Sequence, residues 1–163
     1  MMRFLQTLCL LLLISFGAAA QIPAQTIPQF TFSRLDKTPF SAKDLAKGQK
    51  LLFIFFDTEC EHCQRTISYL GEHYTDIKST PIYLVTLDNQ EKIAGFMNKY
   101  GAKLKGKKNI TLLQDTNKQF IVIFQPRKYP SMFLYSAEKK LLDYEDNDES
   151  VFRILSLIKG KTK

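Results

Sequence analysis

Two cysteines, Cys60 and Cys63, are separated by two residues in the segment Cys60-Glu61-His62-Cys63. At the start of a helix this spacing puts both side chains on one face, so their sulfurs can close a disulfide without moving the backbone. The unpaired N–H groups and the positive end of the helix dipole favour the thiolate of the first cysteine. The pattern predicts that Cys60 attacks a disulfide and that Cys63 resolves the mixed disulfide.

His62 lies between the two cysteines, where a protonated imidazole would further favour the Cys60 thiolate. The carboxylates of Glu59 and Glu61 act in the opposite direction. The balance depends on where these side chains point. His62 is therefore a candidate catalytic residue whose effect the fold decides.

A Cys-x-x-Cys segment can also form half of a metal site. A closed zinc site usually has four Cys or His ligands, and after Cys9 the sequence offers Cys60, Cys63, His62 and His73. Since His62 cannot easily coordinate alongside both flanking cysteines, we expect no metal and no organic cofactor. A copper- or zinc-binding chaperone remains an alternative. His73 has no cysteine or acidic motif around it, so we expect it on a helix surface.

The N-terminus has the features of a secretory signal peptide. A basic start is followed by an apolar run over residues 4–16 and by Ala18 and Ala20, which form an A-x-A cleavage site. The run is shorter than the roughly 20 residues that span a bilayer. We expect residues 1–20 to be removed, leaving 21–163 as a single exported, periplasmic domain without a membrane span.

The composition is that of a compact protein. Of 163 residues, 45% are hydrophobic and 24% charged, which excludes collagen-like, coiled-coil and wholly disordered chains. Loss of Cys9 would leave 3 − 1 = 2 cysteines within one tetrapeptide, so the fold must rest on its apolar core. The formal charge of +7 comes mainly from scattered lysines, densest at Lys103, Lys105, Lys107 and Lys108. We interpret that stretch as a solvated loop and expect no nucleic-acid binding.

The elements around the cysteines alternate between strands and helices. The apolar run in residues 50–56 predicts a central strand covered on both faces, and apolar residues at helical spacing follow the cysteines. Both cysteines thus belong to a strand-to-helix junction. Further strands are expected at residues 81–87, 109–113, 131–135 and 141–144, and a final helix is expected from Asp148 or Ser150.

Three segments carry weaker signals. Residues 29–32 and the turn after them predict an N-terminal hairpin, followed by a short helix from Ser41 through Ala46. Asp88, with Glu91 three residues later, indicates a capping box for a helix that ends at Gly101.

Residues 116–124 have conflicting signals. Phe120 to Phe124 have strand propensity, but the alternation of elements requires a helix, and we predict a helix.

The ordered combination of motifs resembles the thioredoxin fold. A strand, Cys60-Glu61-His62-Cys63, a helix and later Tyr129-Pro130-Ser131 before a strand match its active-site and cis-proline segments. Residues 27–32, 40–45 and 47–50 resemble the N-terminal part of exported TlpA/ResA-like thiol-disulfide oxidoreductases. The resemblance implies an α/β thioredoxin fold, in which helices flank a central mixed β-sheet, with an N-terminal β-hairpin extension and a short strand-helix insertion.

The resemblance also implies a function. Pro130 would have a cis peptide bond, and Tyr129 would offer its backbone to a substrate chain. The partners would be protein thiols and disulfides and a membrane electron-transfer partner, with reduction as the first interpretation. A DsbA-like oxidase or an isomerase is an alternative, because members with a histidine before the second cysteine are oxidising. A peroxiredoxin-like peroxidase would require Thr-x-x-Cys, whereas Asp57 stands at that position.

Two positions depart from the family pattern. Glu59 stands where a tryptophan usually precedes the first cysteine, and Ile54 stands where thioredoxins carry a buried acid that accepts the proton of the second thiol. The acceptor for Cys63 is therefore unassigned. Asp57 and Glu59 are the acidic residues near it in sequence.

Overall fold

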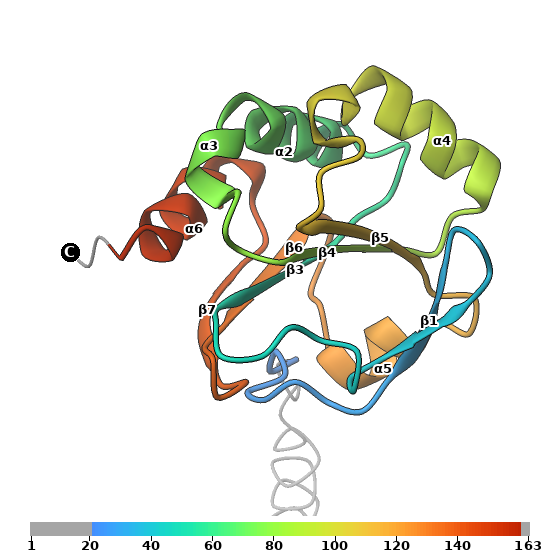
Figure 1. The fold of residues 1–163 in the computed structure, drawn as a ribbon. Coiled ribbons are helices and arrows are strands. Elements are labelled where there is room, and N and C mark those ends of the chain that lie inside the picture. The colour runs from blue at the N-terminus through green and yellow to red at the C-terminus, as the bar shows by residue number, and fades with distance from the viewer. Residues whose placement is uncertain (1–20, 161–163) are drawn as a thin grey trace, which may run out of the picture.

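A computed structural model describes residues 21–160, so the expected signal peptide lies outside the described residues. Within them the chain forms one seven-stranded sheet (Figure 1). Its strands, in spatial order, are β2 (Pro39–Ser41), β1 (Thr31–Arg34), β5 (Ile110–Gln114), β4 (Ile82–Thr86), β3 (Leu51–Phe55), β6 (Ser131–Tyr135) and β7 (Leu141–Glu145).

The sheet is mixed. Strands β3, β4 and β5 are parallel, while β6, β7 and the β1–β2 hairpin pair antiparallel with their neighbours. All five residues of β3 are buried, as expected of a strand covered on both faces. The predicted central strand, N-terminal hairpin and mixed sheet are confirmed.

Helices cover both faces of the sheet (Figure 1). One face carries α2 (Glu61–Glu72), α3 (Tyr74–Ile77), α4 (Gln90–Lys99) and α6 (Val151–Ile158). The opposite face carries α5 (Gln119–Phe124). Two short 3-10 helices, η1 (Ala102–Leu104) and η2 (Asp148–Ser150), follow α4 and precede α6. The segment from α4 through β5 is the strand-helix insertion that the resemblance implied.

The predicted helix within residues 116–124 is confirmed, although α5 begins at Gln119. Phe120 and Phe124 are one helical turn apart, both fully buried, with ring centroids 4.1 Å apart. Val122, on the other side, is 71% exposed. Burial of one helical stripe against the sheet outweighs the strand propensity of this aromatic and β-branched run.

Two local predictions are wrong. No helix forms from Ser41 through Ala46; the backbone N–H and hydroxyl of Ser41 instead donate to the Asp44 carboxylate, which makes a turn. The cap of α4 is Asn89 rather than Asp88, and its side-chain oxygen accepts from the backbone N–H of Lys92. No helix within residues 21–160 has both the length and the apolar character to cross a membrane.

Candidate active site

Cys60 is the N-cap residue of α2, directly after the loop that leaves β3. Its carbonyl accepts the first helical hydrogen bond, from the Gln64 backbone N–H at 3.1 Å. Cys60 is partly exposed and Cys63 is fully buried, and both are free thiols. The predicted position at a strand-to-helix junction is confirmed, and it gives one sulfur access to solvent while the other faces the core.

The environment of Cys63 keeps its thiol protonated. Burial raises the pKa of Cys63 far above its ordinary value of 9.0, which outweighs the opposing hydrogen bond from the Asp57 backbone. The charges of Cys60 and Asp57 raise that pKa further. A proton must therefore leave Cys63 before its sulfur can act as a nucleophile.

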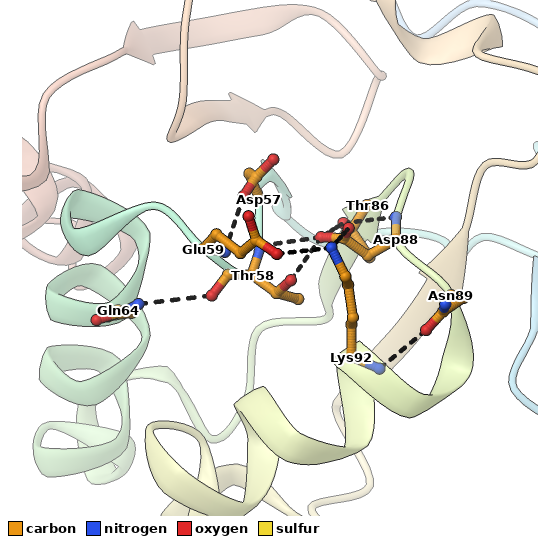
Figure 2. A network of polar contacts seen from close by, with 8 residues as sticks. All are labelled: Asp57, Thr58, Glu59, Gln64, Thr86, Asp88, Asn89 and Lys92. Carbon is orange, nitrogen blue, oxygen red and sulfur yellow. Dashed lines mark hydrogen bonds and ion pairs between the residues drawn. The ribbon is translucent and has the colours of Figure 1, made fainter.

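A polar network fixes the loop between β3 and Cys60 (Figure 2). One oxygen of the Asp88 carboxylate accepts hydrogen bonds from the backbone N–H of Thr58 at 2.9 Å, the Thr58 hydroxyl at 2.8 Å and the Thr86 hydroxyl at 3.2 Å. The Asp57 carboxylate accepts from the backbone N–H of Glu59 at 2.8 Å. Asp88 thus ties the residues just before Cys60 to the end of β4.

Glu59 is paired with a lysine of α4. Its side chain is 76% exposed, and its carboxylate lies 2.6 Å from the ammonium group of Lys92 (Figure 2). Glu61, in the first turn of α2, lies 3.9 Å from the guanidinium of Arg65. Each acid that flanks the cysteines is therefore paired with a cation, which weakens its opposition to a thiolate at Cys60.

His62 is held by a residue far away in the sequence. Its Nδ1 lies 2.6 Å from Oδ1 of Asp148, and the Arg65 Nε donates to the other oxygen of the same carboxylate at 2.6 Å. Burial alone would raise the pKa of Asp148, but the hydrogen bonds from Arg65 and His62 hold it below its usual range. Sequence reasoning missed Asp148 as a site residue, because its pattern indicated only the start of a helix.

The loop before β6 meets the same end of the sheet. The peptide bond between Tyr129 and Pro130 is cis, as the resemblance implied. Ser131 pairs with Phe55, the last residue of β3, which places Pro130 beside the loop that leads to Cys60.

The Tyr129 side chain packs on β3, the strand that leads to Cys60. Its ring packs on Phe55 with centroids 4.8 Å apart, and burial, with the charges of Asp57 and Asp88, raises its pKa to about 12. Tyr129 also borders a pocket of about 170 Å³, together with Phe55, Ile121, Pro126, Arg127 and Lys128.

The histidines have separate environments. His73 lies at the C-terminal end of α2, where its ring stacks on Tyr69 and Nδ1 lies 3.0 Å from the Tyr69 carbonyl oxygen.

Among residues 21–160, no three or more His, Cys, Asp and Glu side chains gather as a metal site would require.

The sequence resembles known families over most of its length. The profile of the AhpC/TSA family matches residues 23–143. The thiol-disulfide oxidoreductase ResA of Bacillus subtilis (strain 168) is 27% identical over 118 residues, covering 71% of this chain and 62% of ResA. ResA of Bacillus anthracis is 25% identical over 119 residues, covering 71% and 65%. The matches span less than two thirds of the length of these relatives.

Solved structures share the fold. MTB dsbF, in mixed oxidized and reduced forms, has a TM-score of 0.69 at 22% identity, with 86% of this chain and 99% of that chain covered. Peroxidoxin BcpB from Mycobacterium tuberculosis has a TM-score of 0.68 at 12% identity, covering 86% and 97%. The thioredoxin-like fold is thereby confirmed. Because both kinds of protein share it, the chemistry must be argued from the site.

Proposed function

We propose that this chain, which belongs to the AhpC/TSA family, is a thiol-disulfide oxidoreductase that exchanges a Cys60–Cys63 dithiol and disulfide with protein substrates. One observation carries the proposal: a partly exposed cysteine caps a helix, and a fully buried cysteine follows it one turn later. The Cys60 sulfur can reach another protein, whereas the Cys63 sulfur can reach only the sulfur of Cys60.

The reaction has two balanced steps in the direction of reduction. The Cys60 thiolate attacks a substrate disulfide, forms a mixed disulfide and releases one substrate thiolate. Cys63 then loses its proton and attacks the Cys60 sulfur, which releases the second substrate thiolate and leaves the Cys60–Cys63 disulfide. Two electrons pass to the substrate, and a reducing partner protein must return them.

Asp57 is our candidate proton acceptor for Cys63. The backbone of Asp57 lowers the pKa of Cys63 and the charge of its carboxylate raises it, which supports a place for Asp57 near that thiol. Glu59, the other acid near in sequence, is 76% exposed and paired with Lys92. A carboxylate beside a thiol with a raised pKa can accept the proton when the mixed disulfide resolves.

The fold is shared with a peroxidoxin, but the site favours disulfide exchange. Asp57 stands three residues before Cys60, where a peroxidase would be expected to carry threonine. The hydroxyl of the nearby Thr58 donates to Asp88 at 2.8 Å, so that donor is already used. Reduction is our first assignment. An oxidase or isomerase is the second, because a histidine precedes the second cysteine, and its Nδ1 lies 2.6 Å from the Asp148 carboxylate.

We also propose the setting in which the protein acts. Residues 1–20 would be a cleaved signal peptide and 21–163 one exported, periplasmic domain. Its partners would be protein thiols and disulfides and a membrane electron-transfer protein. The cis Tyr129–Pro130 segment lies beside the loop that leads to Cys60, which supports substrate contacts by the backbone of Tyr129.

A trapping experiment tests the function. The Cys63→Ser variant, mixed with a peptide disulfide, should accumulate a covalent adduct at Cys60, which intact-mass spectrometry detects. The matched Cys60→Ser variant should form no such adduct, since its remaining thiol is buried. Equal adduct formation by both variants would contradict the assigned roles. Stoichiometric copper or zinc in protein purified without reductant would favour the metal-chaperone alternative.

A further inference from the structure

Asp148 is a buried carboxylate that faces the first turn of α2. Its side chain is 8% exposed, whereas its partners His62 and Arg65 are 59% and 54% exposed. Packing of α6 sets its place, since Val151 and Ile154, on the turns that follow, are buried in the same cluster as Cys63. The buried member of the group is therefore the carboxylate, and the two more exposed side chains are bonded to it.

The contacts of Asp148 determine which nitrogen of His62 carries a proton. An ionised carboxylate only accepts hydrogen bonds, so His62 Nδ1 must be the donor across the 2.6 Å contact with Oδ1. The Nη2 of Arg65 also lies 2.7 Å from this nitrogen, but a protonated Nδ1 has no lone pair to offer it. The bond to the carboxylate is charge-assisted and therefore prevails. This leaves Nε2 as the free nitrogen of the ring.

We propose that Asp148 is a positioning residue of the redox site, which holds His62 and Arg65 at the start of α2, where Cys60 is the N-cap, and so favours the Cys60 thiolate. This inference rests on the proposed function. His62 is two residues from Cys60 on the same helical turn. The pKa of Arg65 is raised first by the hydrogen bond to Asp148, then by the charges of Asp148 and Glu61, and least by the charge of Cys60.

Positioning and simple charge predict opposite effects for Asp148→Asn. If the carboxylate acted only as a nearby negative charge, its loss would stabilise the Cys60 thiolate. If it holds the Arg65 guanidinium and the His62 ring in place, its loss lets both turn towards solvent, and the thiolate is destabilised. The sign of the change therefore separates the two roles.

Nitrogen NMR of the histidine rings tests the geometry without any substrate. The wild-type protein should show His62 protonated at Nδ1, and Asp148→Asn should shift it towards the Nε2–H form. His73, whose Nδ1 faces a backbone carbonyl, serves as an internal reference that the substitution should leave unchanged. A wild-type His62 with Nδ1 unprotonated, accepting from Arg65, would overturn the proposal.

Alkylation of Cys60 by iodoacetamide tests the consequence. In a Cys63→Ser background and at a fixed pH below the range where free thiols ionise, Asp148→Asn should lower the rate about fivefold, the size expected of one charge acting on another near a protein surface. Asp143→Asn is the matched control, because it removes another largely buried acid, paired with Arg153. Its rate should equal that of the parent protein.

Two further variants keep the test decisive. Arg65→Gln and His62→Gln alter side chains that are more than half exposed, so they should fold even if Asp148→Asn does not, and each should lower the rate. In a protein with both changes, Asp148→Asn should no longer lower the rate, because only the loss of a nearby negative charge remains. An unchanged or increased rate in the single variants would overturn the proposal. Because alkylation requires only a thiolate, its result stands even if substrate trapping at Cys60 fails.

Discussion

Replacing Asp88 with alanine should loosen the loop that carries Cys60. One carboxylate oxygen receives three hydrogen bonds, two of them from Thr58, which is only 8% exposed. Hydrogen bonds to a charged group contribute about 1.5–3 kcal/mol each, and a buried donor left without a partner costs about 1–3 kcal/mol. Since water can reach part of the space left by the side chain, we expect Asp88→Ala to lower the free energy of unfolding by about 3 kcal/mol.

Asp88→Asn is the matched variant. Its amide oxygen can still accept from Thr58, so the loss should be about 1 kcal/mol, the contribution of the charge alone. Urea unfolding of the reduced proteins measures both values, and adduct formation at Cys60 reports on the loop itself. The reasoning is refuted if Asp88→Ala is no less stable than Asp88→Asn, or if the loss of stability leaves the rate of adduct formation unchanged.

Three further predictions follow from the charges. Asp57→Asn should slow the resolution of the mixed disulfide about a hundredfold in rapid-quench measurements. Glu59→Gln is the control and should leave this rate unchanged. Equal rates for the two variants would exclude Asp57 as the proton acceptor. The Cys63 pKa is raised on folding, so the reduced protein should lose stability as pH rises above 9.0, and Cys63→Ala should lack this slope in urea titrations. The Asp148 pKa is lowered on folding, so the stabilisation by this carboxylate is present above pH 3.8 and is lost as the pH falls. Asp148→Asn should therefore lose less stability in acid than the wild type. Parallel curves of unfolding free energy against pH would contradict the assignment.

The sequence predicted most elements where local pattern and burial agree. The apolar run of β3 and the helical spacing of Phe120 and Phe124 both correspond to buried surfaces in the fold. The sequence pattern gave wrong predictions where a side chain expected to cap a helix forms its hydrogen bonds with other groups. Ser41 bonds Asp44 in a turn instead of capping a helix, and Asp88 turns back to Thr58, thirty residues earlier, which leaves the cap of α4 to Asn89.

The candidate site shows the same division. The cysteines were predicted from their type and local spacing and Pro130 from the resemblance to the thioredoxin fold, and the cis bond before Pro130 is present. The partner of His62 was not predicted. Asp148 lies 86 residues away, and only the packing of α6 beside α2 brings the two side chains together. Contacts of this kind have no signature in a single sequence.

Redox equilibration with glutathione tests the central claim most directly. Wild-type protein should titrate as one two-electron couple, with a Cys60–Cys63 disulfide in the oxidised form and a potential nearer to thioredoxin's about −270 mV than to DsbA's about −120 mV. Cys60→Ser and Cys63→Ser should abolish the couple. A potential near the DsbA value would contradict the assignment as a reductase, and the absence of a reversible Cys60–Cys63 couple would contradict the account of the site.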